Sequence, residues 1–186
     1  MSIIDKIASK VLPDATEEER AEVRARAREI GRQHGWLAMV IDHHQQIEDA
    51  LDRGANGFDA TARRQALKDL ALVLNGHSLA EEVVLYPSMV EHSEKGHATL
   101  AYEEHTATKI QMHMIEHLDP MSQEWQDKLE HIRGALLHHI YHEEKTWLPN
   151  LAEQAGTESP ALTQRFAEEY NRYSGSAIPE PISEPA

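Results

Sequence analysis

Histidine and glutamate recur at a fixed spacing in two segments of the chain. His77 is followed four residues later by Glu81, and His139 is followed four residues later by Glu143. In both segments a second glutamate comes next, and a proline stands ten residues after the histidine. Residues four apart on an α-helix share a face, one turn apart, so each pair can bind one metal ion. Two such pairs in one chain predict a metal site.

The composition restricts the kinds of site and partner that the chain can have. It contains no cysteine, which excludes thiolate zinc sites, iron–sulfur clusters and disulfides. The 18 Lys and Arg residues against 32 Asp and Glu residues give a formal net charge of −14, which argues against nucleic acid and anionic membranes as partners. We see no signal-peptide pattern and no apolar run of roughly 20 residues. We therefore expect a soluble cytoplasmic protein, as a monomer or homodimer.

Apolar residues recur with helical spacing along nearly the whole chain, whereas alternating β-branched runs are missing. We expect an all-α protein with an antiparallel up-down-up-down four-helix bundle at its centre, because the connections are only about three to ten residues long. The expected bundle helices span residues 35–52, 60–86, 96–118 and 122–147. Gly54 and Pro149 are expected to end the first and fourth of them, and Pro87 is expected to end or kink the second.

Further helices are expected on both sides of the bundle. A capping box formed by Thr16 and Glu19 predicts an N-terminal helix to about residue 33 that packs outside the bundle. Ser159 followed by Pro160 predicts the start of a short C-terminal helix. The expected organisation is an N-terminal helical extension at 1–34, the bundle at 35–152, the C-terminal helix at 153–173 and a disordered tail at 174–186.

Each of the expected bundle helices carries a histidine on its apolar stripe. Steps of seven residues from His44 reach Leu37 and Leu51, which places His44 on the apolar face of its helix. Histidines take equivalent positions on the other three helices, and two of them add a glutamate one turn on. The candidate metal ligands are therefore His44, His77, Glu81, His105, His139 and Glu143.

The ordinary role of such a histidine is a core residue with satisfied hydrogen bonds. Burying several imidazoles and two carboxylates together without a cation would, however, cost many kcal/mol. The chain offers no matching central Lys or Arg except Lys109, so a metal ion is the simplest counter-charge. Nitrogen and oxygen ligands without sulfur favour iron, with zinc or manganese as alternatives, and bridging carboxylates would hold two metal ions.

The pattern resembles that of the hemerythrin-like, or HHE cation-binding, family over about residues 35 to 150. That family has a histidine on the first bundle helix, His-x3-Glu on the second, histidine on the third and His-x3-Glu on the fourth, which matches the six candidates above. The resemblance implies a non-haem di-iron site, with an oxo- or hydroxo-bridged iron pair, that binds or reacts with O2, peroxide or nitric oxide. The alternative is a metal-binding protein for iron storage, sensing or interaction, without turnover.

The first bundle helix offers a second candidate ligand. His43 adjoins His44, but it shares its helical phase with Trp36 and Ala50, a weaker stripe than that of His44. We therefore expect His44 to point into the bundle, and a rotation of about 100° would exchange the two.

The third bundle helix departs from the pattern of the oxygen-carrying hemerythrins, which have a second histidine four residues after the first. This chain has Lys109 at that position. Tyr102, Glu48 or a water molecule could complete the site. An open coordination position would favour reaction over reversible storage.

Further polar residues neighbour the candidate ligands. Glu82 and Glu144 each follow a ligand glutamate, and they could accept hydrogen bonds from ligand imidazoles or remain solvated. His138 and His142 lie about 100° out of phase with the fourth-helix pair. We expect these two histidines to support the site or to face solvent.

Overall fold

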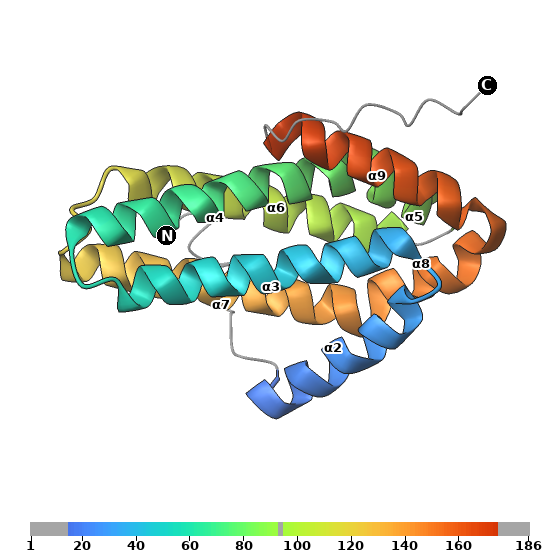
Figure 1. Ribbon diagram of the computed structural model, residues 1–186, viewed down its shortest axis with the longest axis horizontal. Coiled ribbons are helices and arrows are strands. Elements are labelled where there is room, and N and C mark those ends of the chain that lie inside the picture. The colour runs from blue at the N-terminus through green and yellow to red at the C-terminus, as the bar shows by residue number, and fades with distance from the viewer. Residues whose placement is uncertain (1–14, 93–94, 175–186) are drawn as a thin grey trace, which may run out of the picture.

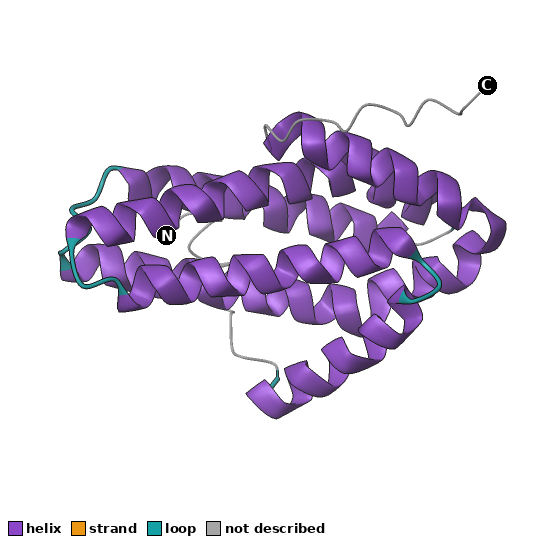
Figure 2. Cartoon of the chain, viewed as in Figure 1, coloured by secondary structure: helices purple, strands orange, loops and turns teal. Residues whose placement is uncertain are grey.

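Helices make up nearly all of residues 15–92 and 95–174, which the computed structural model describes (Figure 2). These two ranges contain no strand, and the expected all-α class is confirmed. Residues 175–186 of the expected disordered tail lie outside the described residues, whereas Ser174 belongs to the last helix.

Four long helices lie side by side as an antiparallel bundle (Figure 1). Each packs against the next along the chain, and the last also packs against the first. Short connections at residues 57–59 and 117–122 reverse the chain direction. The bundle helices are α3 (Gly35–Asn56), α4 (Ala60–Ala80), α6 (Lys95–Glu116) and α7 (Gln123–His142).

The N-terminal helix α2 (Glu17–Gly31) packs outside the bundle against α3. Its expected capping box is confirmed, because the Thr16 hydroxyl accepts from the Glu19 N–H and the Glu19 carboxylate accepts from the Thr16 N–H, at 3.2 and 2.7 Å. In Figure 1, α2 crosses beneath the ends of α3 and α7. From this position Arg24 of α2 reaches Glu48 on α3 and Glu144.

The C-terminal helix α9 (Ser159–Ser174) lies along α4 and also contacts α3 (Figure 1). Gly76 on α4 permits this close approach, since a Cβ there would lie only 2.9 Å from two ring carbons of Tyr170 and 3.0 Å from the Cβ of Ser174. The helix α9 therefore covers a face of the bundle that would otherwise be exposed.

Both prolines expected to end helices instead follow a π-helical turn. After α4 the chain continues through a π turn, Glu81–Leu85, into α5 (Tyr86–Glu91), and after α7 through Glu143–Trp147 into α8 (Leu148–Ala155). The N–H groups of Tyr86 and Leu148 bond to carbonyls five residues back. The wider turn thus accommodates a proline at the next position. The helical path continues past both prolines, so the expected end at Pro149 is wrong, and of the two alternatives for Pro87 an end of the helix is wrong.

The first bundle helix also runs past its expected end. Gly54 lies inside α3, where a Cβ would come within 3.2 Å of a methyl carbon of Leu129. This glycine therefore serves close packing against α7 rather than a helix end.

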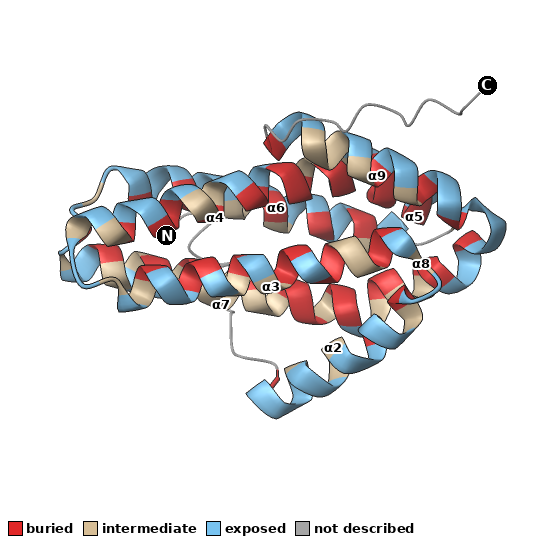
Figure 3. Ribbon diagram, in the orientation of Figure 1, coloured by how far each residue is buried: buried red, intermediate tan, exposed pale blue. Residues whose placement is uncertain are grey.

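Buried apolar side chains form two clusters along the bundle, and buried polar residues separate them. Figure 3 marks the buried positions of each helix in red. On α3, Ile41 belongs to one cluster and Ile47 to the other, with His44 between them. On α4, Ala80 and Leu74 flank His77 in the same way. Among the described helices, none is long and apolar enough to cross a membrane.

Candidate metal centre

The structure brings the six candidate ligands together in one layer between the apolar clusters. Ligand atoms of His44, His77, Glu81 and Glu143 all lie within 4.8 Å of one another. Ligand atoms of Glu81, His105 and His139 form a second group with the same property. Glu81 belongs to both groups, which suits a carboxylate that bridges two metal ions. We call these six residues the polar layer.

Several nitrogen and oxygen atoms of the polar layer lie close to one another. His77 Nε2 lies 3.2 Å from Glu81 Oε2, and His44 Nε2 lies 3.2 Å from Glu143 Oε2. His105 Nε2 and His139 Nε2 face each other at 3.1 Å. Two imidazole nitrogens this close repel each other unless a proton or a cation lies between them.

Burial makes the carboxylates of the polar layer costly without a cation. Glu81 and Glu143 are completely buried. Within the described residues, no hydrogen bond reaches Glu81 Oε1, Glu143 Oε2 or His44 Nε2. Burial and the charge of Glu143 raise the pKa of Glu81 well above its usual range, so the metal-free site favours a proton there. These unsatisfied oxygen and nitrogen atoms fit a divalent or trivalent metal ion.

Carboxylates outside the polar layer orient three of its imidazoles. The Nδ1 atom of His44 donates to Glu144 at 2.9 Å, that of His105 to Glu82 at 3.0 Å, and that of His139 to Glu104 at 2.7 Å. Each of these contacts joins two different helices. Hydrogen bonding at Nδ1 leaves the Nε2 lone pair directed at the centre, as a metal ligand requires.

Cationic side chains in turn hold two of the orienting carboxylates. Arg24 on α2 donates to Glu144 at 2.9 Å and to Glu48 at 2.5 Å. Lys109 on α6 lies 2.5 Å from Glu82. Burial alone would raise the pKa of Glu82, but hydrogen bonds from His105 and Lys109 lower it. Two chains of contacts therefore run inward from the edge of the site, each from a cation through a carboxylate to an imidazole.

His77 differs from the other three imidazoles of the polar layer. Its Nδ1 atom is buried and makes no hydrogen bond within the described residues. Burial, followed by the neighbouring imidazoles, lowers the pKa of His77 well below its usual range. His77 is therefore neutral at physiological pH, the form that can bind a metal.

The two adjacent histidines of α3 point in different directions. His44 lies in the polar layer, whereas the His43 ring stacks on Tyr170 of α9 with 3.8 Å between centroids. His43 is thus buried, together with Trp36 and Ala50 of its stripe. Within this stripe α9 covers His43, whereas Ala50 belongs to an apolar cluster of the bundle, and helical phase alone did not indicate the contact with α9.

Tyr102 and Glu48, the two side chains considered for completing the site, have other partners, and a different tyrosine lies at the polar layer. The hydroxyl of Tyr102 donates to the backbone carbonyl of Glu82, and Glu48 pairs with Arg24. Tyr86 reaches the polar layer instead, with its hydroxyl 3.0 Å from Glu143 Oε1. On an α-helix, Tyr86 would point about 140° away from Glu81, and the π turn reduces this angle.

The remaining histidines lie off the polar layer. His138 and His142 are half-buried beside it, with the His142 ring stacked on Trp147. His113 and His117 are exposed near the end of α6, with ring centroids 4.7 Å apart. Glu104 was not singled out from the sequence, although its position next to His105 resembles that of Glu82 and Glu144 beside their ligands.

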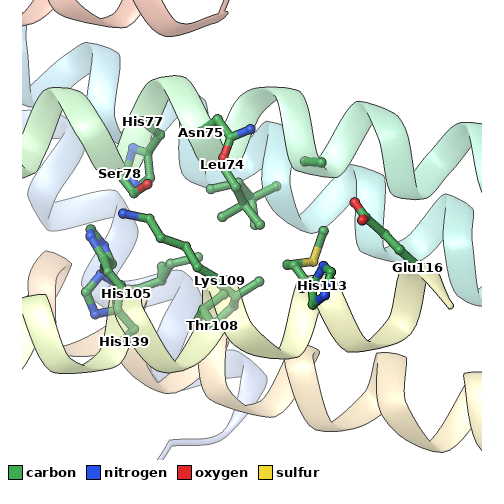
Figure 4. Close-up of a pocket in the computed structure, with 15 residues that line it drawn as sticks. Leu74, Asn75, His77, Ser78, His105, Thr108, Lys109, His113, Glu116 and His139 are labelled. Atoms are coloured by element: carbon green, nitrogen blue, oxygen red, sulfur yellow. Dashed lines mark hydrogen bonds between the residues drawn. The ribbon is translucent and has the colours of Figure 1, made fainter.

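A cavity of about 170 Å³ adjoins the polar layer. Figure 4 shows His77, His105 and His139 at one end of this pocket and Glu116 at the other. Apolar side chains line much of the wall between them, and Ser78 and Lys109 also contribute to the lining. The cavity offers a small molecule a route to the polar layer. The apolar lining residues are Ile47, Ala71, Leu74, Met112, Leu136 and Ile140.

The comparison with protein families agrees with this arrangement. A family model described as the hemerythrin HHE cation-binding domain matches residues 26–151. Neither the curated proteins nor the solved structures compared with the chain give a match. The matched range contains the whole polar layer and both His-x3-Glu pairs. The chain therefore belongs to the family of hemerythrin HHE cation-binding domains.

Proposed function

We propose that this chain is a non-haem di-iron protein that binds or reacts with a small oxidant such as O2, peroxide or nitric oxide. The observation that carries the proposal is Glu81, a completely buried carboxylate shared by two groups of potential ligands. The proposed ligands are the six residues of the polar layer. Iron suits their nitrogen and oxygen atoms best, and zinc or manganese would also fit.

The surrounding residues support reaction with a small molecule. The adjoining cavity has a largely apolar wall, which limits the access of water to the polar layer. Glu82, Glu104 and Glu144 keep three imidazoles in the orientation that binds metal. Bound iron would supply the capacity to exchange electrons with the oxidant, which no side chain of the cavity can do by itself.

The test is anaerobic loading with ferrous iron, followed by metal analysis and an optical spectrum before and after addition of O2, peroxide or nitric oxide. We expect about two irons per chain and a change in near-ultraviolet absorption on exposure to at least one oxidant. Glu81→Gln should lower the iron content, whereas the exposed Glu153→Gln should leave it unchanged. A single zinc with no iron after iron loading would contradict the proposal.

A second candidate function is a sensor, and Arg24 favours it. This side chain links the outer helix α2 to Glu144, which bonds His44. A change in the bonding of His44 could therefore alter how α2 packs. Hydrogen exchange of α2 that differs between the reduced and the oxidised iron-loaded protein would support a sensor, and identical exchange would leave the reaction with an oxidant as the function.

A further inference from the structure

Tyr86 contacts the polar layer without being one of its six residues. It is completely buried at the first position of α5. Its hydroxyl oxygen lies 3.0 Å from Glu143 Oε1, 3.0 Å from His105 Nε2 and 3.4 Å from Glu81 Oε2. A hydroxyl can donate to only one of these acceptors at a time. The oxygen therefore occupies a position where three potential metal ligands converge.

The backbone is arranged so that Tyr86 reaches this position. The π turn from Glu81 to Leu85 brings Tyr86 round to the face that carries Glu81. Pro87 leaves the carbonyl of Glu82 without a helical donor, and the Tyr102 hydroxyl supplies one. The second His-x3-Glu segment has the same π turn, but Leu148 stands at the equivalent place. Of the two His-x3-Glu segments, only the first therefore supplies a phenol oxygen to the site.

The two ligand groups differ in the number of protein ligands. One contains four residues, whereas the group of Glu81, His105 and His139 contains three. The Tyr86 oxygen lies close to two of these three, so it can act as a fourth ligand there. Ferric iron is a hard cation that favours anionic oxygen ligands, and a phenolate is such a ligand.

We propose that the phenol oxygen of Tyr86 is a metal ligand, bound to the ion that Glu81, His105 and His139 hold. This inference rests on the proposed di-iron function. Coordination replaces the O–H bond of Tyr86 with an oxygen–metal bond, and the proton leaves to the buffer. Metal loading of the wild type should therefore release about one proton more than metal loading of Tyr86→Phe.

The test compares the wild type, Tyr86→Phe and Tyr141→Phe, the last a buried tyrosine on α7 whose hydroxyl bonds Lys145 instead of the site. Each protein is loaded with ferrous iron and oxidised with ferricyanide. We expect a visible phenolate-to-iron absorption band, with tyrosine ring vibrations in resonance Raman, in the wild type and in Tyr141→Phe. Tyr86→Phe should still bind iron but lose both signals, and its loading should release about one proton less.

Measurements on the wild type keep the proposal testable if Tyr86→Phe does not fold. A ferric wild type without tyrosine ring vibrations would overturn the role of Tyr86 while leaving the di-iron proposal intact. If the wild type takes up no iron, the di-iron proposal fails. In that case the ultraviolet difference spectrum of the zinc-loaded wild type tests whether Tyr86 is a ligand. Absence of a tyrosinate signal in this spectrum as well overturns the role of Tyr86 as a metal ligand.

Discussion

Glu144 Oε1 lies 2.9 Å from Nδ1 of His44, although the two residues are 100 positions apart and come from opposite ends of the bundle sequence. Glu143, the preceding residue, lies in the polar layer and faces Nε2 of the same imidazole at 3.2 Å. Two consecutive glutamates therefore contact the two nitrogens of one histidine. The segment that supplies a metal ligand also fixes the orientation of a ligand on another helix.

Glu144→Ala should weaken metal binding by about 10- to 100-fold, because His44 would lose the hydrogen bond that holds its tautomer and ring orientation. Glu144→Gln keeps an acceptor oxygen and should have a smaller effect. Competition with a chelator of known affinity measures the change, and Glu153→Ala on the surface is the control. An affinity that stays unchanged in Glu144→Ala would show that this contact does not support the site.

His44→Ala should lower the iron content or shift the optical spectrum, because it removes a side chain of the polar layer. His43→Ala should retain iron, but its melting temperature should fall because the contact with Tyr170 is lost. Iron per chain and the spectrum of both variants separate the two effects. An empty site in His43→Ala together with a full site in His44→Ala would mean that the helix is rotated by about 100° from this assignment.

The metal-free protein should lose stability between about pH 6.5 and pH 9. Burial alone would lower the pKa of His44, but its close contacts with the carboxylates of Glu143 and Glu144 raise it from 6.5 to about 9. A histidine whose pKa is higher in the folded than in the unfolded state stabilises the folded protein. This contribution is complete at pH values below the pKa of the unfolded state, and it disappears as the pH rises through the pKa of the folded state. Its size is on the order of 3 kcal/mol, and the raised pKa of Glu81 acts in the same direction.

Urea unfolding of the metal-free and iron-loaded proteins at several pH values measures this effect. Bound metal keeps His44 deprotonated, so the loaded protein should not lose stability over the same range. It should also be more stable than the metal-free form by roughly 3 to 4 kcal/mol when the metal exceeds its Kd by a few hundred- to a thousand-fold. Equal stability of the two forms at every pH would be incompatible with a metal site in the core.

Gly76→Ala should destabilise the protein by roughly 1 to 3 kcal/mol, because the added methyl group would force α9 away from α4. Its Cβ would meet Tyr170 at 2.9 Å, whereas a Cβ at Gly96, on α6, would meet no heavy atom within 4 Å. Gly96→Ala is therefore the matched control and should be neutral or slightly stabilising. Thermal unfolding measures both, and equal melting temperatures would exclude tight packing of α9 at this point.

Helical periodicity was sufficient to indicate which side chains share a face. The spacing of four residues places His77 beside Glu81 and His139 beside Glu143, and the stripe through Leu37 and Leu51 favours His44 over His43. These inferences need only the regular geometry of one helix. Helical periodicity likewise predicted the all-α bundle, and the lack of cysteine excluded thiolate ligands.

Tertiary structure decided the features that depend on distances between helices or on departures from regular helix geometry. The contact of Glu104 with His139 and the reach of Arg24 to Glu144 join segments whose relative placement no local pattern specifies. Pro87 was expected to end or kink its helix, because the usual rule assumes an α-helix. The π turn before Pro87 lets the helical path continue and changes which residues share a face. Through that turn Tyr86 faces the polar layer, and α-helical periodicity directs the same side chain away from it.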